Sequence, residues 1–230
     1  MTQIEAALNE LMTFSIFSNL NRSEVIDFCR DGQIVCNSHK EKLFQFGEKA
    51  QYFGIVLSGA YKLSKPSMQG MDVIVHFSTP GDVIAAFIMA QAKPIYPVTT
   101  TSMGPSRFLK LPQSSYLNQW KKNSELIFKI QNLLSTRMNI LQQDKVLLKA
   151  PLPQKVATLL MNLVEKHPSS EGLILPLPLT RKEIADAVGA TPESVIRIMS
   201  EWSKQGYLQT NDQNIEILRP DKIIELVEKN

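Results

Sequence analysis

A long stretch without glycine or proline, from about Asn123 to Lys149, constrains the fold more than any other feature. Apolar residues recur in it every seven positions, with two more between them. Such a heptad pattern, sustained over three repeats, favours association between helices. We therefore predict one long helix that associates with another helix through Ile127, Ile130, Leu134, Met138, Leu141 and Leu148. The alternative is that the same stripe packs against the rest of its own chain.

The residues before this helix show a different pattern. Residues 1–30 have helical spacing, but from Ile34 to about Leu111 short apolar runs such as YFGIVLSGAYKLS, MDVIVHFSTPGD, VIAAFIM and SRFLKLP alternate with glycine and proline. Evenly spaced short strands are typical of an antiparallel barrel or jelly roll.

The residues after the helix form a third segment. Pro151 and Pro153 end the helix, because proline lacks the N–H that a helix interior needs. Beyond them come a helix, a short strand, two further helices, and a hairpin formed by YLQ and IEIL around TNDQN. The sequence thus predicts an α+β chain: a jelly roll with N-terminal helices at 1–122, a long helix at 123–150 and a winged helix-turn-helix at 151–230.

The stretch from Leu179 to Met199 carries the start and stop signals of two helices. Thr180 and Glu183 have the spacing of a capping box, which starts a helix at Arg181. Gly189 then suits a turn that needs positive φ. Thr191 is a good N-cap and Pro192 a favoured first helical residue, so a second helix begins there.

The side of the second helix that stays exposed has the residues to contact DNA bases. Arginine bonds to guanine O6 and N7, and glutamate accepts from cytosine N4, so Glu193 and Arg197 are candidates for reading G·C pairs. The alternative is a solvated salt bridge, because the two residues are four positions apart. Polar residues at the two helix starts are candidate phosphate contacts, with ordinary solvated surface as the alternative: Thr180, Arg181, Lys182, Thr191 and Ser194.

The segment LTRKEIADAVGATPESVIRIMSEWSKQGYL resembles the helix-turn-helix of the Crp/Fnr family of bacterial transcription regulators. FGEKAQYFGIVLSGAYKLS and HFSTPGDVIA resemble its β-roll segments, and the helix at 123–149 resembles its dimerisation helix. The resemblance implies a homodimer with a double-stranded β-helix sensor, bound to palindromic double-stranded DNA. It also implies contacts from Glu193 and Arg197 to a TGA element. Pro192 stands where members reading TGTGA have arginine, which favours a TTGAT-like half-site, and Ile196 would contact a thymine methyl group.

The sequence lacks the residues that would identify cyclic AMP as the effector of such a regulator. Family members that bind cyclic AMP use a Gly-Glu pair and an Arg-Ser pair, but Val83 to Thr101 contains no Glu and no Arg. The family's Thr-Ser pair for adenine is replaced by Ile140 and Leu141. These differences argue against cyclic AMP in its usual mode. A candidate pocket for a small-molecule effector, with plain core as the alternative, consists of Phe87, Ile88, Met89, Tyr96, Ile140 and Leu141.

The absence of particular residue patterns limits the cofactors and activities expected of the protein. The N-terminal cysteine cluster of oxygen-sensing members is absent and His76 suits a barrel interior, so we expect no iron–sulfur cluster, haem or other metal. Without a leader, membrane span or catalytic constellation, the sequence predicts a cytoplasmic protein that is not an enzyme. RNA polymerase is an expected partner if the protein activates transcription. Two alternatives stay open: an effector-independent regulator, or a sensor module acting through protein contacts.

Overall fold

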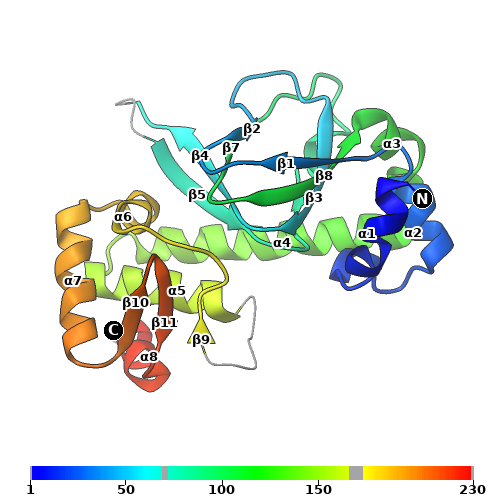
Figure 1. The fold of residues 1–230 in the computed structure, drawn as a ribbon. Coiled ribbons are helices and arrows are strands. Elements are labelled where there is room, and N and C mark those ends of the chain that lie inside the picture. The colour runs from blue at the N-terminus through cyan, green and yellow to red at the C-terminus, as the bar shows by residue number, and fades with distance from the viewer. Residues whose placement is uncertain (1, 69–71, 166–172, 229–230) are drawn as a thin grey trace. The chain divides into compact units, whose positions relative to one another are not determined.

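The computed structural model describes residues 2–68, 72–165 and 173–228 (Figure 1). The chain divides into two compact units. The first comprises residues 1–65 and 76–141, and the second comprises residues 66–75 and 142–230.

Two four-stranded sheets form the roll of the first unit. One has the strand order β1-β8-β3-β6 and the other β2-β7-β4-β5. The pairs β1·β8, β3·β8, β3·β6, β2·β7 and β4·β7 are antiparallel. The strand bounds are β1 Gln33–Asn37, β2 Lys42–Phe44, β3 Tyr52–Ser58, β4 Tyr61–Pro66, β5 Asp72–Ser78, β6 Val83–Ile84, β7 Thr99–Ser102 and β8 Ser106–Pro112. The predicted jelly roll is confirmed.

The strands β3 and β8 approach most closely at a glycine. A Cβ built on Gly54 would lie 1.8 Å from the Leu109 carbonyl oxygen, so no larger residue fits there without moving the backbone. Fully buried Phe53, Ile55 and Phe108 fill the space between the sheets. This core holds the two sheets of the roll together.

Short helices cover one end of the roll (Figure 1). They are α1 (Gln3–Leu11), α2 (Arg22–Cys29) and α3 (Gln113–Asn118), with 3-10 turns η1 (Ser15–Phe17) and η3 (Trp120–Lys122). Thr2 and Asn21 cap the first two helices through complete capping boxes. The buried Trp120 donates its indole N–H to the Phe28 carbonyl at 3.0 Å and packs edge-on against Phe17 and Phe53.

The predicted long helix is α4, Ser124–Leu147, which runs along the roll in the first unit (Figure 1). Leu126 and Ile130 are buried in the core of the roll. Lys129 also ties α4 to the N-terminal segment, donating to the Ser15 carbonyl at 2.7 Å. One side of the helix therefore belongs to the fold of the single chain.

The second unit is a small helical domain with a hairpin. Its elements are α5 (Leu152–Glu165), β9 (Leu173–Ile174), α6 (Arg181–Val188), α7 (Pro192–Lys204), β10 (Leu208–Asn211), β11 (Asn214–Ile217) and α8 (Pro220–Glu228). The antiparallel sheet has the order β10-β11-β9. Gln154 fastens α5 to the end of α8 by donating to the Val227 carbonyl at 2.8 Å. This arrangement is the predicted winged helix-turn-helix.

Two local features differ from the sequence expectation. The run VIAAFIM was expected as a strand, but only Val83–Ile84 is one, and the 3-10 turn η2 (Ala86–Ile88) follows. Alanine has low strand preference, and Ala85 has φ +66°, which bends the chain out of the sheet. The wing turn is also tighter than the five residues expected: only Asp212 and Gln213, both at positive φ, separate the two strands.

Candidate DNA interface

Helix α6, the first helix of the helix-turn-helix, begins and ends where the sequence predicts. The Thr180 hydroxyl accepts from the Glu183 N–H at 3.1 Å, and the Glu183 carboxylate accepts from the Thr180 N–H at 3.0 Å. Ile184 and Ala185 are fully buried. Gly189 ends the helix at φ +69° and donates its N–H to the Ala185 carbonyl, as a left-handed C-cap requires.

The next helix, α7, presents two different faces. Thr191 caps it by accepting from the Ser194 N–H at 3.4 Å, and Pro192 occupies its first turn. Val195, Ile198, Met199 and Trp202 are buried. Packing of these residues fixes the rotation of α7 and decides which side chains remain outside.

The outer face of α7 carries the predicted base-reading residues. Glu193, Ile196 and Arg197 are all exposed on its first two turns. A spacing of four positions allows an ion pair on a helix. Glu193 and Arg197 nevertheless form none in the described part of the chain. The carboxylate and the guanidinium therefore both face solvent, next to an exposed isoleucine.

The predicted phosphate contacts are in different environments. Arg181 is half-buried, and its guanidinium donates to the Thr210 hydroxyl on β10 at 2.9 Å. Burial lowers the pKa of this guanidinium from its ordinary value. Lys182 is exposed and pairs with Asp186 at 2.7 Å. Thr191 and Ser194 bond to one another through their hydroxyls at 3.1 Å.

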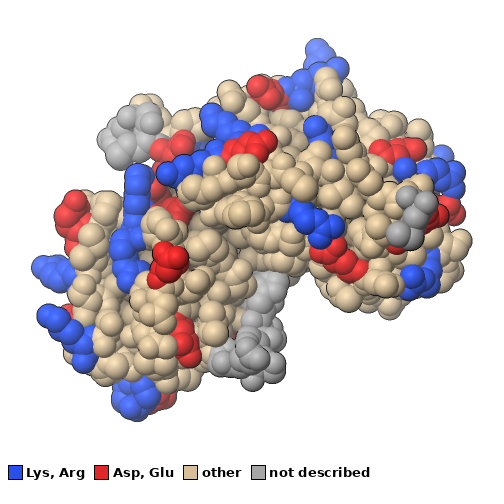
Figure 2. All heavy atoms as spheres, viewed as in Figure 1, with Lys and Arg blue, Asp and Glu red and all other residues tan. Residues whose placement is uncertain are grey.

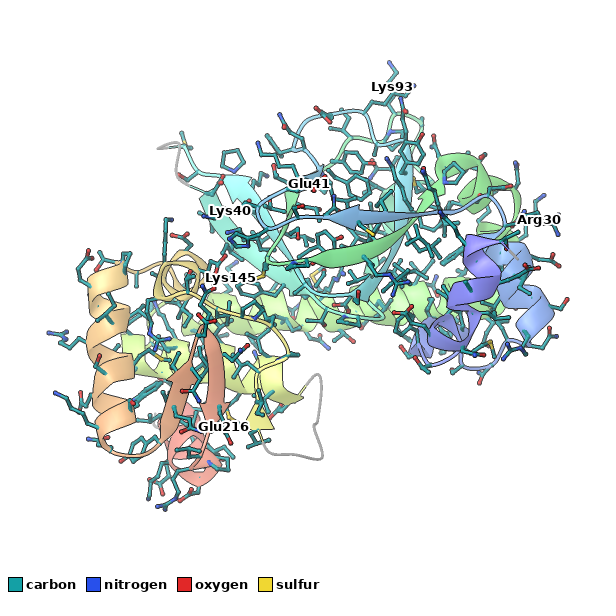
Figure 3. The ribbon with its side chains drawn as sticks, viewed as in Figure 1. Arg30, Lys40, Glu41, Lys93, Lys145 and Glu216 are labelled. Atoms are coloured by element: carbon teal, nitrogen blue, oxygen red, sulfur yellow. The ribbon has the colours of Figure 1, made fainter. Side chains whose placement is uncertain are left out.

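The contact between Arg181 and Thr210 links α6 to the wing and was not predicted. The two residues are 29 positions apart, and no short-range pattern joins them. The wing also has a cross-strand contact, in which Gln209 donates to the carboxylate of Glu216, labelled in Figure 3. Charged residues of both signs are interspersed on the visible face of the molecule (Figure 2), so position rather than bulk charge defines the candidate interface.

The six residues predicted as a sensor pocket do not come together. Ile88, Met89 and Tyr96 are buried in the core of the roll. The Tyr96 ring stacks on Phe44 with 4.4 Å between centroids, and its hydroxyl donates to the Tyr52 carbonyl at 2.8 Å. Burial raises the pKa of this hydroxyl to about 12. The burial of these three residues agrees with the plain-core alternative, in which apolar side chains fill the interior as they usually do.

The other three predicted pocket residues lie at the surface or near it. Ile140 is half-buried on α4, whereas Leu141 and Phe87 are exposed. A shallow apolar hollow does exist beside Phe87, lined by Val83, Ala86, Phe87, Ile130, Leu133, Leu134 and Arg137. The Arg137 guanidinium donates to the Val83 carbonyl at 3.1 Å, and burial lowers its pKa although nearby Asp82 opposes that shift.

The predicted dimer residues divide between two sides of α4. Ile130 is buried in the core of the roll and Ile127 packs against it, so Ile130 cannot face a second copy. Leu134, Met138, Leu141 and Leu148 are exposed. The two sides differ because the roll occupies the helix face that contains Leu126, Ile130 and Leu133.

Comparisons with known proteins match both units. A Crp-like helix-turn-helix domain covers residues 154–226, and a cyclic nucleotide-binding domain covers residues 38–123. The nitrogen fixation regulation protein FixK of Bradyrhizobium diazoefficiens is 26% identical over 220 residues, 93% of this chain and 90% of that protein. The structure of FixK2 from Bradyrhizobium japonicum superimposes with a TM-score of 0.76 at 20% identity, covering 86% of this chain and 98% of that one. The chain belongs to the Crp/Fnr family.

Other relatives of the chain are a transcriptional activator and a cAMP-activated regulator. The transcriptional activator FnrA of Stutzerimonas stutzeri is 27% identical over 77% of this chain and 73% of its own length. A CRP-like cAMP-activated global transcriptional regulator of Mycobacterium tuberculosis is 20% identical over 90% of this chain and 94% of its own length. This Crp/Fnr chain is accordingly a transcription regulator with a DNA-binding helix-turn-helix.

Two further properties concern the described residues alone. None of their helices combines the length and apolar character that a membrane crossing requires. No three His, Cys, Asp or Glu side chains among them gather closely enough to hold a metal ion.

Proposed function

We propose that this regulator binds a palindromic, TTGAT-like DNA site as a homodimer, with the start of α7 in the major groove. The observation that carries the proposal is the exposed group Glu193, Ile196 and Arg197, held over a buried face on α7. The N-terminal part of a recognition helix is the part that contacts base edges. A carboxylate and a guanidinium that are not paired with each other keep their bonding capacity for bases.

Each of the three side chains has a proposed partner. Arg197 donates to guanine O6 and N7, Glu193 accepts from cytosine N4, and Ile196 contacts a thymine methyl group. We further propose that Thr180, Arg181, Lys182, Thr191 and Ser194 contact phosphates, which set position rather than sequence. For Lys182 this contact competes with the Asp186 pair, so its contribution is expected to be the smaller.

The dimer is proposed to form through the exposed side of α4. Two recognition helices must lie about 34 Å apart to read adjacent turns of DNA. The proposed division of the chain is a sensor roll at 1–122, a dimerisation helix at 123–150 and a DNA-binding domain at 151–230. A small-molecule effector acting on the roll would shift the spacing of the two recognition helices by its differential binding.

The test is a fluorescence anisotropy titration at fixed salt with a TTGAT-N4-ATCAA duplex and a scrambled duplex. Arg197→Ala should weaken binding to the specific duplex about 5- to 150-fold, the equivalent of roughly 1–3 kcal/mol, and lower selectivity at one base pair. Arg219→Ala is the matched control, because Arg219 is an exposed arginine of the same unit that pairs with Asp221 at 2.8 Å. Equal affinities for wild type and Arg197→Ala on both duplexes would refute the base-reading role.

A further inference from the structure

The outer side of helix α7 carries a line of exposed residues that continues to the end of the helix. Its members are Glu193, Arg197, Ser200 and Lys204. Their spacings of four, three and four positions place them on one side of an α-helix. Glu193 and Arg197 belong to the base-reading group, and Lys204 lies beyond them in the last turn.

Buried and hydrogen-bonded groups hold the end of α7 in place. Trp202 is buried, and its carbonyl accepts from the Tyr207 N–H at 2.9 Å just after the helix. The Gln205 N–H donates to the Glu201 carbonyl at 3.0 Å, so regular helical bonding continues through the last turn. The buried face that exposes the start of the line therefore also exposes its end, at Lys204.

The Lys204 ammonium forms no ion pair with any residue that the structure describes. The acid one turn earlier is Glu201, but its carboxylate accepts from the Gln205 side-chain amide at 3.4 Å. Lys182, by comparison, pairs with Asp186 at 2.7 Å. Lys204 is thus an exposed cation that can bind an external anion without breaking an internal ion pair.

The distance along α7 from Arg197 to Lys204 matches the size of the DNA groove. Seven residues rise about 10 Å along an α-helix. The major groove of B-form DNA is about 12 Å wide. With Arg197 at the base edges inside the groove, Lys204 reaches the border of the groove, where the phosphates lie.

We infer that Lys204 contacts a DNA backbone phosphate at the edge of the major groove where α7 ends. The phosphate contacts proposed above lie at the starts of α6 and α7, whereas this contact holds the opposite end of the recognition helix. Lys204 is a positioning residue, because phosphate contacts set the placement of a helix and do not read sequence. The inference rests on the proposed entry of α7 into the groove.

Anisotropy titrations of full-length Lys204→Met at several salt concentrations test the inference. The variant should bind the TTGAT-N4-ATCAA and scrambled duplexes more weakly by the same factor, because a phosphate contact does not depend on the bases. The salt slope of log affinity should fall by about 1 for each bound subunit. The loss per subunit should therefore be roughly threefold greater at 50 mM than at 150 mM salt. Lys204→Arg keeps the cation and should retain the wild-type slope.

Lys222→Met is the matched control, because Lys222 is a lysine of the same unit that pairs with Glu225 on α8. It should leave the salt slope unchanged. A lysine in the last turn also stabilises a helix through the helix dipole. Loss of that effect in Lys204→Met would lower the unfolding temperature without changing the salt slope. An unchanged slope for Lys204→Met, or an equal fall for Lys222→Met, would overturn the phosphate contact.

Arg197→Ala separates this inference from the proposed function. If Arg197→Ala loses selectivity while Lys204→Met keeps the wild-type slope, α7 reads bases and the contact at Lys204 is overturned. If Lys204→Met lowers the slope while Arg197→Ala keeps its selectivity, the phosphate contact stands and base reading is overturned. If neither variant differs from wild type, α7 does not enter the groove and both are overturned.

Discussion

The Arg137 guanidinium donates a hydrogen bond to the Val83 carbonyl oxygen at 3.1 Å and so fastens α4 to strand β6. The bond joins residues 54 positions apart and lies beside the hollow that Phe87 and Leu134 also line. It gives the first unit a polar connection between strand β6 of the roll and the helix proposed to form the dimer.

Replacing this guanidinium should loosen the connection. In Arg137→Met the Val83 carbonyl loses its partner, which costs roughly 1–3 kcal/mol, partly offset because a buried charge is no longer desolvated. We expect a net loss of about 1 kcal/mol, equivalent to roughly fivefold faster hydrogen exchange of amides in β6 and the adjoining part of α4. Mass spectrometry of exchanged peptides measures this rate.

The control for Arg137→Met is Arg30→Met. Arg30 pairs with Asp27 where both side chains are exposed, and such pairs contribute little to stability. Faster exchange in β6 for Arg30→Met, or unchanged exchange for Arg137→Met, would contradict the assigned role.

The wing turn should become more stable when Gln213 is replaced by glycine. Gln213 has φ +72° and is exposed, so Gln213→Gly removes backbone strain without removing a packed side chain. We expect a gain of about 0.5–1 kcal/mol, because a two-residue hairpin turn of this kind prefers glycine. Calorimetry should show the unfolding transition of the second unit at higher temperature.

Gln209→Gly provides the opposite case for comparison. Gln209 lies within strand β10, where glycine weakens the strand. That variant should unfold at lower temperature than wild type. Destabilisation by both glycine substitutions would show that positive φ at position 213 is not the source of strain.

The two cysteines should differ in reactivity. Burial raises the pKa of the Cys29 thiol to about 12, so it stays protonated at pH 8, and the protonated thiol is a poor nucleophile. Cys36 is exposed on β1. Iodoacetamide at pH 8 should therefore modify Cys36 in the folded protein and leave Cys29 unmodified, as intact-mass measurement can check.

Folding itself should be what protects Cys29. In Cys36→Ser the folded protein should take up no label at pH 8, and one label per chain once urea is added. Because the raised pKa lies well above the working range, protection of Cys29 should persist as pH rises to about 10. Rapid labelling of folded Cys36→Ser would contradict the burial of Cys29.

The contribution of Arg181 to DNA affinity should depend on salt concentration. One of its N–H groups bonds to Thr210, which leaves others for a phosphate. Arg181→Met should weaken binding equally on specific and scrambled duplexes and reduce the salt slope of log affinity by about 1. Anisotropy titrations at several salt concentrations give this slope.

Thr210→Val separates the wing contact from the phosphate contact. It removes the hydroxyl that accepts from Arg181 but keeps the cation, so the salt slope should stay at the wild-type value. If Arg181→Met also leaves the slope unchanged, Arg181 braces the wing and does not contact phosphate.

The most accurate predictions from the sequence concern features that depend on interactions between residues close together in the chain. Both helices of the helix-turn-helix begin at the predicted caps, Thr180 and Thr191, and Gly189 has the predicted positive φ. The jelly roll was predicted from the spacing of short apolar runs. In the run VIAAFIM the strand ends after Ile84 and η2 follows, because Ala85 has positive φ, and a pattern of apolar residues does not reveal the backbone angle of one residue. A periodic pattern reports which residues are apolar and says less about how the backbone turns.

The sequence by itself determined the order of the elements and the caps, because capping depends on contacts within three or four residues. Only the tertiary structure decided which side of α4 the roll covers, and hence that Ile130 belongs to the core while Met138 and Leu141 stay exposed. It alone brought Arg137 to Val83 and Arg181 to Thr210. A heptad repeat does not say which of two partners will bury it, because the roll and a second helix both accept an apolar stripe.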